Sequence, residues 1–224
     1  GGPVADRILF SKFGRARFIS HLDLMRTIQR AFFRSGIQIK HTEGYNPHPF
    51  VSIALPLSVG YSSDCEIMEF VLLGGASYED LPEKMNAVLP EGVSVQACYP
   101  AENKLKELAY LNCIVRMDYD NGVPEAAEAA WRELLSRESL VVKKKSNKSK
   151  LGYTETDIIS LIHRWTLTAE EKDIRLDLVL SAQNPGLNPV VIRDAFCEAY
   201  PELTPDFMAV HRKEALDINE KPFR

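Results

Sequence analysis

Residues 15–26, Arg-Ala-Arg-Phe-Ile-Ser-His-Leu-Asp-Leu-Met-Arg, hold the signals that define the first helix and, through it, the fold. Ser20 is a good N-cap, and Asp23 stands three residues later, where a capping box has its acidic residue. Apolar residues then recur at helical spacing, at Leu24, Ile28 and Ala31. Gly36 ends this pattern, since glycine readily adopts the left-handed conformation found at helix ends. The sequence therefore predicts an amphipathic helix over 20–35.

Strand-like segments surround that helix in a regular order. They are found at 7–13, 51–57, 65–73 and 93–99, and a second helix is predicted over 77–89. The resulting order, β-α-β-β-α-β, is typical of a ferredoxin-like domain with an antiparallel sheet. The polar segment 100–108 has the composition of a linker.

The same order returns after the linker. Strands are predicted at 109–117, 140–145, 151–157, 174–180 and 207–212, and helices at 124–136 and 189–199. Residues 158–167 fit either a strand or a helix. We therefore predict an α+β protein of two tandem ferredoxin-like (βαββαβ) domains with antiparallel sheets. The N-terminal domain covers 5–102, and the C-terminal domain covers 108–224 with an inserted basic hairpin.

Composition places the chain among globular proteins. Of its 224 residues, 45% are hydrophobic and 26% are charged, which argues against intrinsic disorder. No apolar run reaches the roughly 18 residues of a membrane span, and no secretory signal is visible, so we expect no membrane attachment. Four cysteines are scattered without a C-x-x-C pair: Cys65, Cys98, Cys113 and Cys197. This pattern favours reduced thiols in the cytoplasm over disulfides or a zinc site.

Charge is unevenly distributed along the chain, whose formal net charge is −4. Residues 1–60 carry 8 basic and 3 acidic side chains, and residues 141–150 carry 5 lysines without an acid. Two basic segments on an acidic body favour local contact with a polyanion over coating of nucleic acid, and we predict no DNA binding. Chance clustering of solvated charge is the alternative interpretation.

Arginines line the first predicted helix. Arg26, Arg30 and Arg34 recur every four residues and so share one side of it. A planar guanidinium can bind a phosphate through two hydrogen bonds, which suits an RNA backbone or a phosphorylated partner. Three further basic residues precede the helix, namely Lys12, Arg15 and Arg17. The alternative is a solvated helix face whose arginine stems cover apolar surface.

Two other segments are candidate binding elements. The stretch Tyr45-Asn46-Pro47-His48-Pro49 is stiffened by its prolines, and its aromatic rings could stack on an RNA base. The same stiffness equally suits a structural crossover. The predicted hairpin carries lysines that could reach nucleic acid, namely Lys143, Lys144, Lys145, Lys148 and Lys150. A mobile solvated hairpin is the alternative there.

Catalytic signatures are sparse. His21 stands at the start of the predicted helix, where a neutral imidazole can act as a general base beside a phosphate. A histidine that closes the strand–helix turn by hydrogen bonding is the structural alternative. The spacing of His21, His41 and His48 gives no support for a shared metal site, and no nucleotide-binding or other cofactor motif occurs. We therefore expect no cofactor and no catalysis by the isolated protein, with His21 as the only catalytic candidate.

These segments together resemble the radical SAM-linked protein family, an uncharacterised bacterial domain family. The resemblance is carried by residues 17–24, 43–49 and 55–57, together with Arg26, Arg30, Arg34, Gly60, Ser63 and Glu66. It is specific over about 15–70 and weaker over the rest of the chain. Gln38 and Phe50 depart from the family pattern. Members are fused to, or encoded beside, radical S-adenosylmethionine (SAM) enzymes, so the resemblance implies such an enzyme as a partner. The sequence lacks the C-x-x-x-C-x-x-C triplet that holds a radical SAM cluster, so this chain is not itself the iron–sulfur subunit.

The leading functional hypothesis combines these observations. It is an accessory, substrate-binding protein that works with a radical SAM enzyme and binds RNA. Two alternatives from other classes stay open. One is a metal-independent RNA-processing enzyme that uses His21, and the other is a pure protein–protein adaptor whose basic segments meet an acidic partner.

Overall fold

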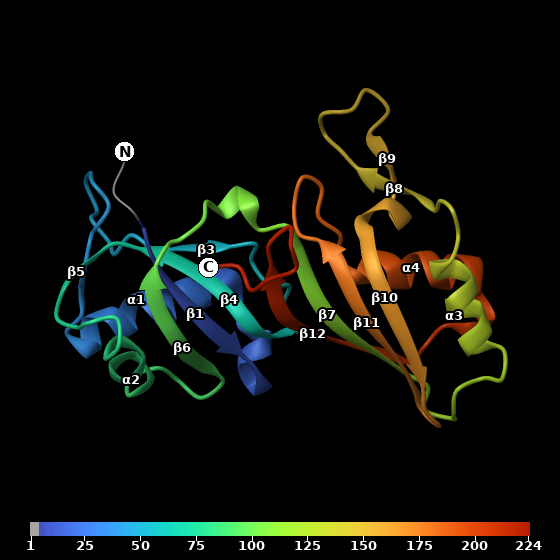
Figure 1. Ribbon diagram of the computed structural model, residues 1–224, viewed down its shortest axis with the longest axis horizontal. Coiled ribbons are helices and arrows are strands. Elements are labelled where there is room, and N and C mark those ends of the chain that lie inside the picture. Colours follow the sequence, from blue (N-terminus) through green and yellow to red (C-terminus); the bar gives the residue numbers. More distant parts are fainter. Residues whose placement is uncertain (1–4) are drawn as a thin grey trace. The chain divides into compact units, whose positions relative to one another are not determined.

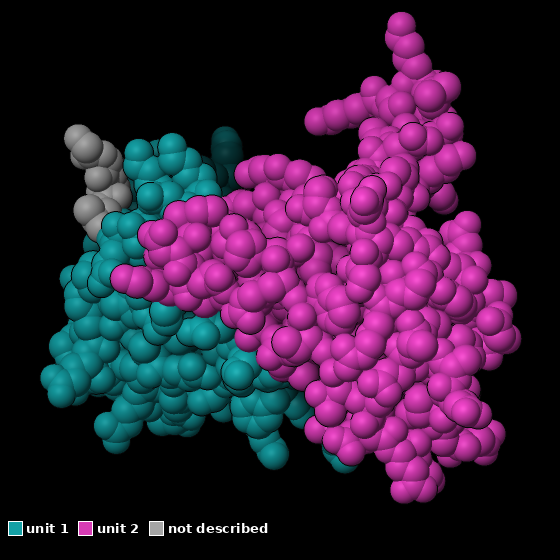
Figure 2. Space-filling view, turned by 45° about the vertical axis from the view of Figure 1, so that its right-hand side comes forward, with its two compact units in different colours: residues 1–107, 211–214, 222–224 teal, residues 108–210, 215–221 magenta. Residues whose placement is uncertain are grey.

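The structure, a computed structural model, describes residues 5–224 (Figure 1). The fold is α+β, with a mostly antiparallel sheet and few helices. The chain divides into two compact units (Figure 2). Of the described residues, unit 1 comprises 5–107, 211–214 and 222–224, and unit 2 comprises 108–210 and 215–221. Parts of the C-terminal segment therefore belong to unit 1, although the sequence predicts that the whole segment lies in the second domain.

The sheet of unit 1 is centred on strand β1 (Asp6–Lys12), whose residues are almost all buried. The strand order is β6-β1-β4, and β3 pairs with the other side of β4. All three of these pairs are antiparallel. The other strands are β3 (Ser52–Ala54), β4 (Ser62–Phe70) and β6 (Val93–Pro100).

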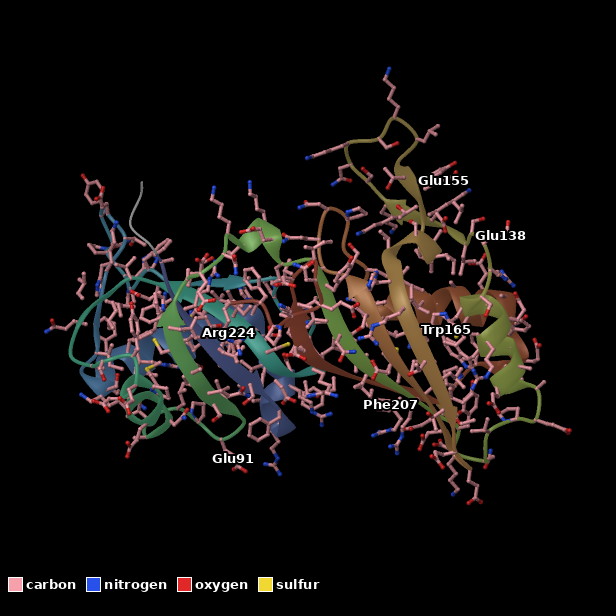
Figure 3. The ribbon with its side chains drawn as sticks, in the orientation of Figure 1. Glu91, Glu138, Glu155, Trp165, Phe207 and Arg224 are labelled. Carbon is pink, nitrogen blue, oxygen red and sulfur yellow. The ribbon has the colours of Figure 1, made fainter. Side chains whose placement is uncertain are left out.

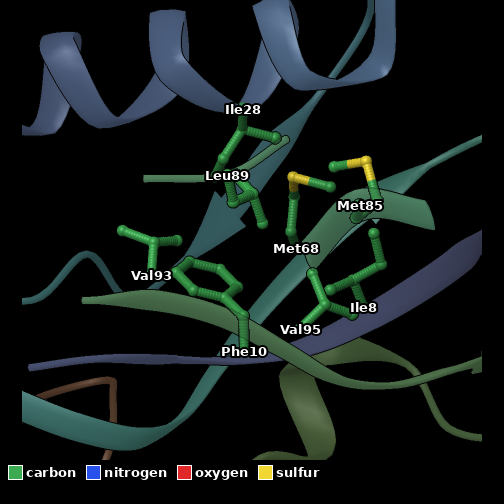
Figure 4. A pocket seen from close by; sticks show the side chains of 8 residues that line it. All are labelled: Ile8, Phe10, Ile28, Met68, Met85, Leu89, Val93 and Val95. Atoms are coloured by element: carbon green, nitrogen blue, oxygen red, sulfur yellow. The ribbon is translucent and has the colours of Figure 1, made fainter. Parts of the chain in front are cut away.

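Two helices, α1 (His21–Ser35) and α2 (Leu81–Asn86), cover one face of this sheet. Ile28 of α1 and Met85 of α2 point at the same strand residues, including Met68 (Figure 4). The space left between them is about 10 Å³, roughly one water position. Because each such buried side chain stabilises the fold by about 1.5–3 kcal/mol, this contact fixes α1 on the sheet.

The ends of α1 are those that the sequence predicts. Ser20 Oγ accepts a hydrogen bond from the Asp23 N–H at 3.1 Å. Gly36 adopts the left-handed conformation, with φ of 73°, and its N–H donates to the Phe33 carbonyl. The buried face consists of Leu24, Ile28, Ala31 and Phe32. The prediction of an amphipathic helix over 20–35 is confirmed.

A short strand pair that the sequence did not predict follows α1. It consists of β2 (Gln38–Ile39) and β5 (Leu72–Gly74), which run antiparallel. The Phe50 N–H donates to the Lys40 carbonyl at 2.9 Å, which brings the chain back beside β2. The intervening residues 41–48 form a loop that is exposed along most of its length.

Unit 2 has the strand order β10-β11-β7-β12. Its strands are β7 (Tyr110–Asp118), β10 (Ile162–Ala169), β11 (Asp173–Ser181) and β12 (Phe207–Leu216). Its helices are α3 (Ala127–Leu135) and α4 (Pro189–Ala199). The rings of Trp131 and Phe196 stack with centroids 3.7 Å apart, so α3 and α4 pack together through buried aromatic side chains.

The inserted hairpin is present in unit 2. It consists of β8 (Val141–Lys145) and β9 (Tyr153–Asp157), which pair antiparallel around the predicted polar turn. The ambiguous segment 158–167 contains a short 3₁₀ helix, Ile159–Leu161, followed by the start of β10. It is therefore divided between two elements.

One strand pair in unit 1 is parallel, unlike the fully antiparallel sheets that we expected. His211 and Arg212 of β12 pair with Ser62 and Ser63 of β4. The physical reason is the short length of β3, which pairs only with residues 67–69 of β4. The remaining backbone groups on that side of β4 need hydrogen-bond partners, and β12 supplies them.

Candidate nucleic-acid interface

The exposed side of α1 presents three arginines to solvent: Arg26, Arg30 and Arg34. Arg26 lies 3.8 Å from Asp23, and both side chains are largely exposed, so this contact is weak. Within residues 5–224, neither Arg30 nor Arg34 forms an ion pair. The stripe therefore offers guanidinium groups that are free to meet an anion.

Lys12 does not belong to this surface, and its assignment as a surface binding residue is corrected. Only 1% of Lys12 is exposed, because β1 is the central strand of unit 1. Its Nζ donates to the carbonyl of Ile19 at 2.9 Å. Burial lowers the pKa of the Lys12 ammonium, and the nearby carboxylate of Glu66 opposes that shift. This lysine helps to fix the turn before α1.

Arg15 and Arg17 lie in the 3₁₀ helix Gly14–Phe18, just before α1. Arg15 is exposed, and Arg17 is partly exposed. Nε of Arg17 donates to the Gly14 carbonyl at 2.8 Å, and its guanidinium lies 5.1 Å from the centroid of the exposed Phe18 ring. A stacked arginine–aromatic pair is therefore presented near the start of the helix.

His21 is the first residue of α1 and is exposed. Among residues 5–224, its side chain makes no hydrogen bond that would close the strand–helix turn. Asp23, the nearest acid in sequence, lies beside Arg26 instead. The structure thus places His21 next to the arginine stripe without assembling a catalytic group around it.

The loop over residues 41–48 is held in shape by its own polar groups. The Thr42 N–H donates to the His48 carbonyl at 2.8 Å, and the His48 N–H donates to Thr42 Oγ1 at 3.2 Å. Nδ1 of His48 lies 3.1 Å from the Asn46 carbonyl. Tyr45 is fully exposed at the tip of this loop. The aromatic rings of the loop are therefore displayed on a rigid support.

Contacts at the base of the loop connect it to α1. Gln29 Nε2 donates to the Pro49 carbonyl at 3.2 Å. The rings of Phe33 and His41 meet edge to face, with centroids 5.8 Å apart. Sequence reasoning missed Phe33, although an aromatic residue between arginines on the polar face of a helix was a usable signal. The structure thus joins the base of this loop, through Pro49 and His41, to α1, the helix that carries the arginine stripe.

The lysine hairpin is a separate element of unit 2. Lys143, Lys144, Lys145, Lys148 and Lys150 are all exposed. Nζ of Lys143 lies 4.6 Å from the centroid of the Tyr153 ring. Lys143 is also opposite Glu155, which Figure 3 labels on the hairpin. The hairpin therefore combines positive charge with an aromatic ring, and Glu155 and Asp157 reduce its net charge.

A hydrogen-bonded serine–histidine–aspartate chain was not visible in the sequence. Ser62 Oγ lies 2.7 Å from Nδ1 of His211, and Nε2 of His211 lies 2.9 Å from Oδ2 of Asp64. A catalytic triad joins the serine to Nε2 and the acid to Nδ1 of its histidine, which is the reverse of this arrangement. Its acid is also normally buried, whereas Asp64 is 55% exposed. We interpret these three hydrogen-bonded side chains as a polar bridge between β4 and β12. Since His211 is far from β4 in sequence, only the strand pairing reveals it.

A buried ionic cluster lies beside this bridge. Oε2 of Glu66 accepts hydrogen bonds from Ser63 Oγ at 2.7 Å and from Arg212 Nη1 at 3.0 Å. Arg212 Nη1 also donates to the Leu55 carbonyl at 2.7 Å. With the Lys12 ammonium nearby, the carboxylate is neutralised inside the protein. The cluster is structural, because each of these polar groups has a partner.

In residues 5–224, no three His, Cys, Asp or Glu side chains converge as metal ligands would. None of the helices over the same residues is long and apolar enough to span a bilayer.

Comparison with known proteins gives one family match. The family model described as "Uncharacterized protein conserved in bacteria (DUF2344)" matches residues 6–189. A search of curated proteins gives no match. A solved structure described as "an Unknown Protein from Galdieria sulphuraria" is 11% identical, with a TM-score of 0.28 over 93% of this chain and 98% of that one.

Proposed function

The chain belongs to the uncharacterized bacterial family DUF2344, and we propose that it is an accessory protein that binds RNA. The observation that carries the proposal is the exposed stripe of Arg26, Arg30 and Arg34 beside the rigid aromatic loop. Guanidinium groups on a fixed helix bind phosphates, and neighbouring aromatic rings can stack on bases. Each RNA nucleotide carries both a phosphate, which guanidinium groups can bind, and a base, on which aromatic rings can stack.

A radical SAM enzyme is the proposed partner, and a cytoplasmic location follows from that role. The proposal of this partner rests only on the resemblance of residues 15–70 to radical SAM-linked proteins. In this scheme the protein holds an RNA substrate while the partner carries out the reaction. The chain itself would supply binding and orientation.

A ferredoxin-like fold for each unit is part of the same proposal. In unit 1 the order β6-β1-β4-β3 is that of a βαββαβ domain whose last strand lies beside its first. In unit 2 the order β12-β7-β11-β10 has the same form once the inserted hairpin is set aside. In such a domain the outer sides of the helices and several loops stay exposed, so they can contact RNA.

Binding of a labelled single-stranded RNA over a salt series tests the proposal. Replacing Arg26, Arg30 and Arg34 by Gln is expected to weaken binding and to flatten the slope of log K against log salt by up to about 2, since each lost phosphate contact removes about 0.7. The matched control replaces Lys104, Lys106 and Lys172 by Gln. These three lysines are exposed and lie outside both basic segments. The control removes the same charge and should change the slope much less.

The alternative functions give different results in that experiment. Equal effects of the two triple variants would mean that only net charge matters and would remove the helix from the interface. If the wild-type protein binds no RNA but co-purifies with a radical SAM enzyme through the arginine stripe, the adaptor function replaces the present one. Cleavage of RNA that is lost in a His21→Ala variant would establish the enzyme alternative.

A further inference from the structure

A groove in unit 1 lies between the end of α1, β2 and the base of the 41–48 loop. It has a volume of about 280 Å³ and is open to solvent. Its lining includes Phe33, Ile37, Gln38, Ile39, His41 and Pro49. This volume is slightly below the roughly 300 Å³ at which ligand sites usually begin, so the groove has room for one flat ring system and no larger ligand.

The walls of the groove provide a surface on which such a ring can stack. Phe33 is 65% exposed although it is a large aromatic residue, and it stands edge to face with the His41 ring. Ile37 and Ile39 are buried and form the apolar floor. An exposed aromatic side chain over an apolar floor favours a planar, weakly polar group.

Polar groups in the groove can form hydrogen bonds with the edge of a bound ring. Nδ1 of His41 lies 3.0 Å from the Ile39 carbonyl, which can only accept, so Nδ1 carries the hydrogen. In the neutral imidazole, Nε2 is therefore an acceptor. Gln38 adds an exposed amide that can both donate and accept. Amino, imino and carbonyl groups on a nucleobase edge match this set.

Cationic side chains stand close to the groove residues along the chain. Arg30 lies three residues before Phe33 and is therefore its neighbour on the surface of α1, and Arg34 follows Arg30 one helical turn later. Lys40 is exposed between the groove residues Ile39 and His41. The lining includes no acidic residue. A neutral base in the groove would thus have its phosphates near cationic side chains.

We propose that this groove binds one unpaired base of a single-stranded RNA, stacked on Phe33, with flanking phosphates on Arg30 and Arg34. The inference rests on the proposed RNA-binding function and specifies its substrate class. A base within an A-form duplex is stacked and paired, and the deep, narrow major groove hides its edge. The site therefore requires an unpaired nucleotide.

The test uses a short single-stranded RNA that carries 2-aminopurine, a base whose fluorescence responds to stacking. Wild-type protein should bind this RNA and change its fluorescence, whereas the same strand in a duplex should bind more weakly. Phe33→Ala should weaken binding roughly 5- to 150-fold, the range for loss of one base–aromatic stack. Phe33→Trp should restore the affinity, because it restores the stacking surface.

Phe207→Ala is the matched control, since Phe207 is 56% exposed and lies in the part of β12 that belongs to unit 2 (Figure 3). This variant should leave RNA binding unchanged.

If no RNA binds to the wild-type protein, the proposed function itself fails. If RNA binds in an arginine-dependent manner but Phe33→Ala has no effect, or the duplex binds equally well, only the base-binding groove is refuted. If a single-stranded DNA of the same sequence binds equally well, the proposal that the groove is specific for RNA is overturned.

Discussion

Arg212 Nη1 donates to Glu66 Oε2 at 3.0 Å in unit 1, and the two side chains are 13% and 1% exposed. Two charges taken out of water in this way depend on each other, because each compensates the desolvation of its partner. Lys12 and Ser63 complete the cluster around the same carboxylate. The free energy of unfolding should therefore respond strongly to loss of one partner.

We expect Arg212→Met to lower the free energy of unfolding by about 3–5 kcal/mol, since it leaves Glu66 buried without its main counter-charge. Urea denaturation followed by circular dichroism measures this change. The control is Arg175→Met, which breaks an exposed 3.0 Å contact with Asp173 and should cost less than about 1 kcal/mol. Similar losses in the two variants would contradict a buried, mutually dependent pair.

The Cys98 thiol should give the protein a stability that decreases at alkaline pH. Burial, and secondarily the charge of Asp6, raises the pKa of Cys98 to about 12 from an ordinary value of 9.0. The unfolded chain therefore loses this proton first, so the associated stability is complete below pH 9 and is lost as pH rises toward about 12. Denaturation at a series of alkaline pH values measures the slope.

Cys98→Ala isolates that contribution. Tyr78 titrates in an overlapping range, because its hydrogen bond to Asp6 raises its pKa to about 12. The wild-type and Cys98→Ala proteins share that tyrosine, so the difference between their pH profiles reports the cysteine. Parallel profiles above pH 9 would show that the thiol titrates normally.

Gly75 should not tolerate a side chain. It has a φ of +84°, and an added Cβ would lie 2.4 Å from the Gly36 carbonyl oxygen. Gly75→Ala should therefore destabilise the protein by more than the roughly 1–2 kcal/mol of the backbone conformation alone. Gly14→Ala is the control, because Gly14 has a φ of +59° and open space around its Cβ position. Thermal unfolding should place the Gly75 variant clearly below the Gly14 variant.

The lysine hairpin should contribute to RNA affinity without contributing to stability. Lys143, Lys144 and Lys145 are exposed on β8, so their replacement by Gln should leave the unfolding transition unchanged. If the hairpin contacts the same RNA as α1, the salt dependence of binding should become less steep. Lys104, Lys106 and Lys172 again serve as the control set. Unchanged binding with a stable fold would exclude the hairpin from the interface.

Local chemistry in the sequence predicts much of this fold. The Ser20 cap, the Gly36 terminus and the period of α1 are encoded within a few residues, so they could be predicted directly. The alternation of β7 and the Asn188 cap of α4 are similar cases, with Asn188 Oδ1 accepting from the Val190 N–H. Such signals need no knowledge of distant contacts.

The predictions that were wrong, and the features that the sequence did not reveal, all depend on contacts between residues that are far apart in the sequence. Lys12 looks like a surface cation in sequence, but the strands on both sides of β1 enclose it. The groove at Phe33 depends on β2, a strand of two residues whose pairing with β5 spans more than 30 residues of chain. The bridge from Ser62 to His211 depends on a parallel strand pair with no spacing signal. Periodicity cannot reveal partners of this kind.

Because the last residues return to unit 1 after 215–221 have joined unit 2, no single cut of the chain releases either unit whole. A fragment ending at 107 would lack Arg212 and also Phe223, whose buried ring lies 4.9 Å below the Arg7 guanidinium. We expect that fragment to be unstable alone and to refold when a synthetic peptide covering 207–224 is added in trans. Gain of protease resistance on mixing measures this complementation, and a peptide with Arg212→Met and Phe223→Ala should fail to provide it. The C-terminal tail would then act as an intramolecular ligand, so that folding of the first part of the chain is completed only after the last part has been synthesised.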